Sequence, residues 1–129
     1  MIGKAIYGRL QAVSAVTALV STRVYPDYAP QNATYPFVVY RLTNNLPSDT
    51  KEGPSVLDTA QVTVEAYAAT YDAAINVAEN VRTALDRYSG TIESIVIDSI
   101  RFSNSQSFDM NFDEHIYVIE QTYEVRQKR

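Results

Sequence analysis

The chain has 129 residues, of which 46% are hydrophobic and 20% are charged, and its formal net charge at pH 7 is −4. This length fits a single domain, 1–129, and the apolar content is sufficient for a folded core. The absence of cysteine excludes disulfides, thiolate metal sites and cysteine nucleophiles. The negative charge has the wrong sign for general phosphate binding, so nucleic acid is a poor candidate for a direct partner.

The first segment predicts an amphipathic helix over about residues 2–20. Apolar side chains recur there with helical spacing and form one stripe: Ile2, Ile6, Leu10, Val13, Val16 and Val20. Lys4 and Arg9 break the continuous apolar run that a signal peptide needs, and no later stretch reaches the length of a membrane span. We therefore expect a protein that stays in the cytoplasm where it is made and does not associate with a membrane.

A connector with the sequence RVYPDYAPQNATYPFVVY, residues 23–40, leads from this helix to the first long strand. Its three prolines push the residue before each of them out of helical geometry. We expect an extended passage in which Val24 and Tyr25 form a short strand, followed by a strand from Phe37 to Leu42. The prolines would then hold the connector extended and deliver that strand into the sheet in register.

Two predicted hairpins make up most of the remaining chain. Residues 45–56 are polar and contain two prolines, and we expect a flexible loop there, followed by a strand over about residues 57–68. Later, β-branched residues over 92–102 and an alternating run over 115–125 predict a second pair of strands. The polar segment 103–113 between them is predicted to be another flexible loop.

A second helix is predicted between the hairpins, from Tyr71 to Tyr88. Thr70 is suited to cap its start, Asp72 to its first turn and Gly90 to its stop. The order of elements therefore predicts an α+β fold. We expect a mainly antiparallel, four-to-five-stranded sheet with two helices packed on one face.

No catalytic, cofactor-binding or metal-ligating residue is predicted. His115 lies near several acids, but its spacing from Asp109, Asp113 and Glu114 matches no ligand pattern, so a rim position on the sheet is the better interpretation. Glu65 and Glu120, with Glu124, could act as paired carboxylates, although outward strand positions facing water explain them more simply. We expect neither an enzyme nor a cofactor.

Several segments together resemble the tail completion or tail terminator proteins of long-tailed, siphovirus-like phages, prophages and gene transfer agents. The resemblance covers nearly the whole chain, in order, although each motif is short. Its motifs are VSTRVYP at 20–26, APQ at 29–31, YPFVVY at 35–40, AQVTVEAYA at 60–68, VRTAL at 81–85 and HIYVIEQTYEV at 115–125.

The resemblance implies a structural protein of the virion tail and neck, assembled in the host bacterial cytoplasm. Such a protein forms a homohexameric ring on the head-proximal end of the tail tube, stops tube polymerisation and offers an attachment surface for the head or neck. Its partners would be other copies of itself, the tail tube protein and a head-completion or neck protein, while genomic DNA passes through the ring without specific binding. A head-closure or other neck component is the alternative, and a small α+β ligand-binding domain or enzyme is a more distant one.

Partner contacts are expected in the two predicted loops. In the second loop apolar side chains alternate within a polar segment, a pattern that calls for cover by the same chain or by another one. The predicted interface residues are Asn44, Asn45, Pro47, Asp49, Lys51, Glu52, Pro54, Phe108, Met110 and Phe112.

Overall fold

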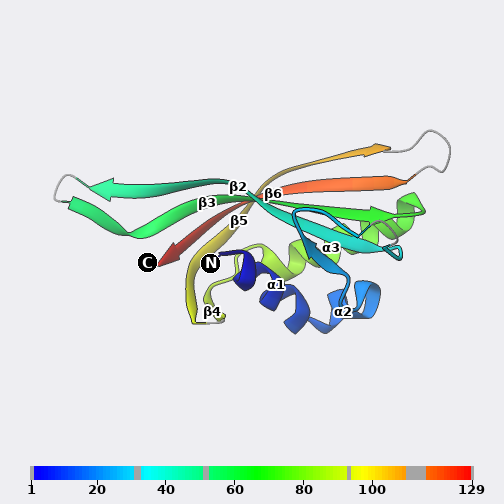
Figure 1. Cartoon of the computed structure of the whole chain (residues 1–129), viewed down its shortest axis with the longest axis horizontal. Coiled ribbons are helices and arrows are strands. Elements are labelled where there is room, and N and C mark those ends of the chain that lie inside the picture. Colours follow the sequence, from blue (N-terminus) through cyan, green and yellow to red (C-terminus); the bar gives the residue numbers. More distant parts are fainter. Residues whose placement is uncertain (1, 31–32, 51–52, 93, 110–115, 129) are drawn as a thin grey trace.

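The structure is a computed structural model that describes residues 2–30, 33–50, 53–92, 94–109 and 116–128 (Figure 1). Side chains are described for these residues except at position 2 and in the stretches 43–50, 53–58, 106–109 and 128. The described helices are α1 (Ile2–Ala12), α2 (Ser14–Val20) and α3 (Tyr71–Leu85). The described strands are β1 (Val24–Pro26), β2 (Phe37–Thr50), β3 (Gly53–Ala68), β4 (Gly90–Ile92), β5 (Ile95–Asp109) and β6 (Tyr117–Lys128).

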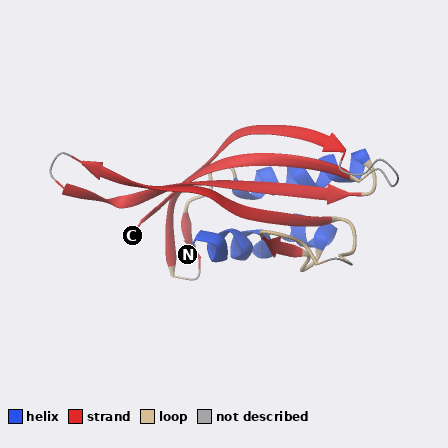
Figure 2. Ribbon diagram, turned by 45° about the horizontal axis from the view of Figure 1, so that its top comes forward, coloured by secondary structure: helices blue, strands red, loops and turns tan. Residues whose placement is uncertain are grey.

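The strands form one curled sheet in the order β1-β2-β3-β6-β5-β4 (Figure 2). Strand β1 runs parallel to β2, and every other pair of neighbours is antiparallel. The α+β class is therefore confirmed, but the sheet has six strands where four to five were expected. The additional strands are the three-residue edge strands, of which β1 was predicted as a short strand and β4 was merged with β5.

The single N-terminal helix that was predicted is two helices. Val13 adopts an extended conformation (φ −99°, ψ 112°) and acts as the N-cap of α2, where its carbonyl accepts hydrogen bonds from Val16 and Thr17. Alanine, valine and serine at positions 12–14 include two weak helix formers, so the break costs little. The break left no trace in the apolar periodicity because the apolar stripe of both helices is buried, that of α1 against α3 and the sheet and that of α2 against α1 and α3.

Both predicted loops are largely strand, and this part of the sequence-based interpretation was wrong. Strand β2 continues to Thr50 and pairs with β3 from Gly53 onward, across two irregularities in the register. Strand β5 likewise continues to Asp109, which pairs with Tyr117. Polar composition signalled exposure to solvent, but the backbone hydrogen bonds of a ladder do not depend on apolar side chains. Residues 51–52 and 110–115 lie outside the described part of the chain.

Helix α3 begins as predicted and ends earlier. The Thr70 hydroxyl accepts a hydrogen bond from the Ala73 amide at 3.2 Å, which confirms the cap. The helix stops at Leu85 because Asp86 is extended and Arg87 takes a positive φ of 64°. The Asp86 carboxylate then accepts a hydrogen bond from the Phe102 amide at 3.0 Å, so the end of the helix is attached to β5. Gly90, the predicted stop, lies in β4.

The three helices cover one face of the sheet (Figures 1 and 2). Helix α3 packs on the central strands β3, β6 and β5, while α1 packs on α3 and also touches β2 and β4, near the two opposite edges of the sheet. Gly8 permits the contact with β4, because a Cβ at this position would lie 2.6 Å from Cγ2 of Ile92. The sheet therefore curls until parts of both edges reach α1.

A chain of buried polar groups ties α3 to the sheet within the apolar core. The Gln121 amide donates to the Ala78 carbonyl at 3.0 Å, and the Tyr123 hydroxyl donates to Oε1 of Gln121 at 2.8 Å. Tyr123 is fully buried, and burial raises the pKa of its phenol well above the ordinary value. Each of these buried hydrogen bonds satisfies a polar group inside the core, so together they hold α3 in one register on β6.

We predict that these two side chains contribute to stability as a coupled pair. Tyr123→Phe should lower the free energy of unfolding by about 1–2 kcal/mol and Gln121→Leu by about 2–3 kcal/mol, because each leaves a buried polar group without its partner. The double variant should lose about 0.5–1 kcal/mol less than the sum, since the second change removes a group already orphaned. Urea unfolding of the four proteins measures this, with Thr83→Ala on the exposed side of α3 as control. Strictly additive losses would contradict the coupling.

Candidate assembly surfaces

The β2–β3 hairpin carries the first group of predicted interface residues. Asn44, Asn45, Pro47 and Asp49 lie on β2 and Pro54 on β3, whereas Lys51 and Glu52 lie outside the described residues. Strand β6 accompanies β3 only as far as Leu57, which pairs with Lys128. Beyond that level no other described strand pairs with β2 or β3, and Figure 1 shows the two strands extending past the helices as an arm.

The second group of predicted residues lies at the opposite end of the sheet. Phe108 is on β5 and pairs with Val118, while Met110 and Phe112 lie outside the described residues. Asp109 pairs with Tyr117, which in turn pairs with Ala68, the last residue of β3; the hairpin arm begins at the first residues of that strand. The two candidate surfaces are therefore separated by the full length of β3, which could not be predicted from the sequence.

Each outer strand of the sheet is paired along only part of its length. Strand β1 covers β2 from Val38 to Tyr40, and in the described chain no strand pairs with the outer side of β2 from Leu42 to Thr50. On the other side, β4 covers β5 up to Ile97, and Arg87 and Tyr88 exchange backbone hydrogen bonds with Ile100. The described residues include no partner for the outer side of β5 from 103 to 109.

The sheet face away from the helices carries a small layer of its own. Phe37, Val39 and Val118 are buried without being part of the main core. Phe37 lies in an aromatic row, with ring centroids 4.8 Å from Tyr67, 5.2 Å from Tyr35 and 5.9 Å from Tyr25. Tyr25 and Tyr35 of the connector therefore extend this row, whereas Tyr28, at 79% exposed, is largely in solvent.

A buried carboxylate lies next to this row. Glu65 is 5% exposed and forms an ion pair with Arg41, so the expectation that it faces water was wrong. It pairs directly across the strands with Glu120, as the paired-carboxylate interpretation required, whereas Glu124 lies further along β6 opposite Gln61. Burial raises the pKa of the Glu65 carboxyl; Arg41 opposes the rise, and the facing Glu120 adds to it.

Neither Glu65 nor Glu120 lines any of the three described cavities, although Arg41 borders one of them. The two cavities that adjoin α1, of about 260 and 550 Å³, and the one beside β5 are lined by other residues. Among the described residues no group of three or more His, Cys, Asp or Glu side chains could hold a metal ion. His115, Asp113 and Glu114 of the acidic cluster lie outside the described chain. No described helix is long and apolar enough to cross a membrane.

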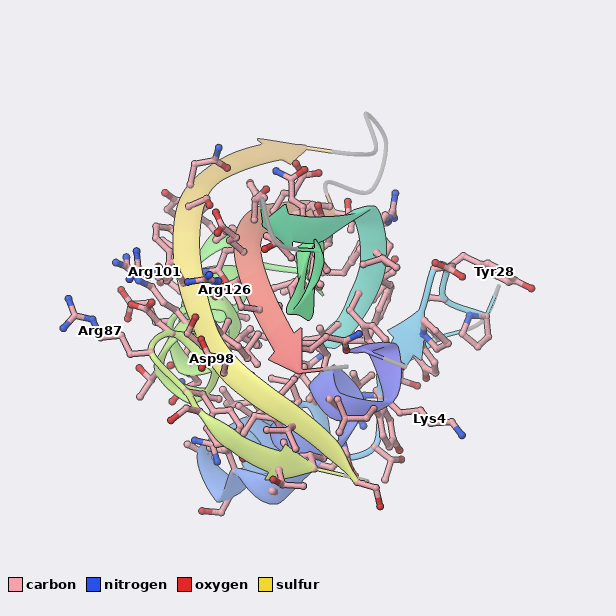
Figure 3. The ribbon with its side chains drawn as sticks, turned by 90° about the vertical axis from the view of Figure 1, so that its left-hand side faces the viewer. Lys4, Tyr28, Arg87, Asp98, Arg101 and Arg126 are labelled. Carbon is pink, nitrogen blue, oxygen red and sulfur yellow. The ribbon has the colours of Figure 1, made fainter. Side chains whose placement is uncertain are left out.

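The cavity beside β5, of about 610 Å³, is bordered by charged side chains. Arg82 stacks on Phe102, with its guanidinium carbon 3.8 Å from the ring centroid. Figure 3 shows Arg87, Asp98 and Arg101 along the outer side of β5. Since this region holds both signs of charge, it suits a protein surface better than a bare phosphate. This region lies along the part of the β5 edge between Ile97, where the pairing with β4 ends, and residue 103.

We predict an unusual pH dependence of stability from Glu65. Because its folded pKa is raised above the unfolded value of about 4.3, the folded protein binds the additional proton between the two values. The contribution of Glu65 is therefore fully present below the unfolded pKa and is lost as pH rises through the folded pKa. The difference in unfolding free energy between the wild type and Glu65→Gln should fall with rising pH, in denaturant titrations at several pH values. Glu79→Gln, on the exposed side of α3, is the control. A flat difference curve would contradict the assignment.

Comparison with known proteins identifies a family for this chain and solved structures that share its fold. The family described as tail completion protein gp17 matches residues 4–128. Among solved structures, a chain from the virion of a native gene transfer agent particle has a TM-score of 0.76 and 19% identity over 96% of this chain and 92% of its own. A second structure has a TM-score of 0.58 and 16% identity with the same coverage. These likenesses show a shared fold, and no curated protein matches. The family match spans nearly the whole sequence, so the chain belongs to the tail completion protein gp17 family and is a structural tail protein.

Proposed function

We propose that this protein closes the head-proximal end of a tail tube as a ring of six identical subunits. The observation that carries the proposal is the family match over residues 4–128. The ring would stop the addition of further tube subunits and present a surface to a head-completion or neck protein. The protein would assemble in the host cytoplasm and remain in the virion at the junction of tail and neck.

The shape of the subunit supports a ring. Its two incompletely paired edges lie at opposite corners of the sheet, so a contact between copies through these edges would join two different surfaces. Such head-to-tail contacts close into a ring when the rotation between copies permits. A compact subunit with one self-complementary patch would instead favour a two-fold dimer.

The projecting ends of the sheet are the proposed contacts to other tail proteins. The arm, with Asn44 to Asp49 and Pro54, extends past the helices in Figure 1, and Phe108 lies on β5 at the opposite end of the sheet. We assign Lys51, Glu52, Met110 and Phe112 to the same contacts from their positions in the sequence. The net charge of −4 is compatible with a channel that DNA passes without being held.

The proposal predicts that the purified protein limits the growth of tail tubes. Native mass spectrometry and negative-stain images should show rings of six, alone or at one end of each tube. Adding the protein to polymerising tube subunits at a molar ratio of about six per tube should arrest elongation. Tube length over time is the measurement, and a Phe108→Ser/Phe112→Ser variant that stays folded should arrest growth less well.

Two results would contradict the proposed role. Tubes that elongate equally fast with and without the protein would show that it is no terminator. Binding to emptied or filled heads in the absence of tubes would assign it to the head side of the neck. Loss of folding in the double serine variant, seen by circular dichroism, would make those phenylalanines core residues.

A further inference from the structure

Two of the cavities adjoin each other along one side of α1. One, of about 260 Å³, lies between the first turns of α1, the end of β1 and residues 40–42 of β2, and the other, of about 550 Å³, follows α1 as far as Ala12. Lys4 and Tyr40 line both cavities, so the two form one groove, which we call the α1 groove. The larger cavity is in the size range of sites that take up a small molecule or several side chains.

The sequence of α1 forms this groove with a second face of the helix. Lys4, Tyr7 and Gln11 recur at helical spacing on the groove side, and Gly8 and Ala12 lie next to them. Because glycine and alanine have almost no side chain, they leave the surface hollow between the longer side chains. The buried apolar stripe of the same helix lies on another side, so α1 has one face for the core and one for the groove.

Apolar side chains of the α1 groove remain exposed in the isolated subunit. Leu42 is 43% exposed and Tyr7 is 36% exposed, and both line the groove; Tyr28, at 79% exposed, follows Asp27 of its wall. These three are half of the six large hydrophobic residues that are exposed in the described part of the chain. Since exposed apolar side chains gather here, whereas ordinary surface positions are scattered singly, the groove has the character of a contact site.

The apolar segment 108–112 lies on the other side of the sheet and cannot fill the α1 groove of its own copy. Phe108 of β5 is level with Phe37 of β2, with β6 and β3 between them, which is about 14 Å across the sheet. From this level β2 runs toward Tyr40 and β5 runs in the opposite direction, so the chain after Asp109 leads away from the groove. Residues 110–115 are too few to cross three strand spacings and return.

The groove and this segment are complementary in charge as well as in apolar character. The sequence FDMNFDE, residues 108–114, holds three acidic residues and no basic one. Figure 3 shows Lys4 projecting on the flank opposite Arg87 and Arg101, and no ion pair holds it within the described chain. Asp27 lines the groove at the end of β1, so the cationic side is the one formed by α1. An ammonium group beside apolar walls suits a segment in which acids stand between apolar residues.

We infer that the α1 groove of one copy binds Phe108, Met110 and Phe112 of the neighbouring copy, with Lys4 facing the acidic residues between and after them. The inference rests on the proposed ring and deepens it, because the tail protein that these residues contact is then another copy of the same chain. The groove and the segment are different surfaces on opposite sides of the sheet, so the contact is head-to-tail, the kind that can close into a ring. The arm remains for a different tail or neck protein.

Engineered cysteines test the contact directly, because the chain contains none of its own. Rings of a Leu42→Cys/Met110→Cys variant, treated with a short bismaleimide, should give a ladder of covalent oligomers up to the ring on a denaturing gel. Each single variant should stay monomeric, and a mixture of the two single variants should stop at dimers. Val96→Cys/Met110→Cys is the matched control and should not cross-link, because Val96 is nearly as exposed as Leu42 but lies on β5 beside β4.

Charged substitutions give an independent readout by native mass spectrometry over a dilution series. Leu42→Asp should weaken ring formation at least tenfold, because an apolar contact is lost and a carboxylate meets an acidic segment. Val96→Asp, at a position of similar exposure outside the groove, should leave ring formation unchanged. Lys4→Glu should weaken it about threefold, and Asp113→Lys/Glu114→Lys in the same chain should restore it. Circular dichroism checks that each subunit stays folded.

The outcomes separate this inference from the proposed function. Intact rings that do not cross-link, or that tolerate Leu42→Asp as well as they tolerate Val96→Asp, would overturn the groove contact and leave the proposed function standing. Cross-linking of position 110 to a tube or neck protein in place of position 42 would overturn it too. Failure to find any ring, free or on tubes, would overturn both.

Discussion

The right-handed twist of a long-stranded sheet is the constraint on which the rest of this structure depends. A twisted sheet is saddle-shaped, so one of its diagonals bends toward the helices and the other bends away. Along the first diagonal both edges of the sheet contact α1: Gly8 packs against Ile92, and Gly3 packs against the ring of Tyr40. The short strands β1 and β4 complete the sheet at these edges. Along the second diagonal the arm and the far end of β5 diverge from the helices, and no described strand pairs with their outer sides. The same deformation closes the subunit core and leaves two edges for assembly.

This geometry explains why the central strands are buried on both faces in so small a protein. The helix-facing side holds the apolar core, while Val39, Glu65 and Val118 are buried on the other side. On that second side, the aromatic row around Phe37 and the ion pair between Glu65 and Arg41 form a small layer of their own.

Sequence reasoning predicted the elements that rest on apolar patterns and missed those that rest on the backbone alone. The stripe from Ile6 to Val20, the Thr70 cap and the strand beginning at Phe37 follow from spacing and side-chain chemistry. The strands through Thr50 and Asp109 could not be predicted, because their side chains are polar and their partners are set by register. Burial of Glu65 was equally hidden, since an alternating strand does not reveal that its second face is covered. The resemblance identified the family, but the distance between the candidate surfaces required the fold.

The most direct measurement is a cryo-electron microscopy reconstruction of the ring on a tail tube, at a resolution that traces the strands. The account predicts a ring of six copies at the head-proximal end of the tube, with the arm formed by β2 and β3 in contact with another tail or neck protein. A ring with a different number of copies, or one that lies elsewhere than at this end of the tube, would contradict it.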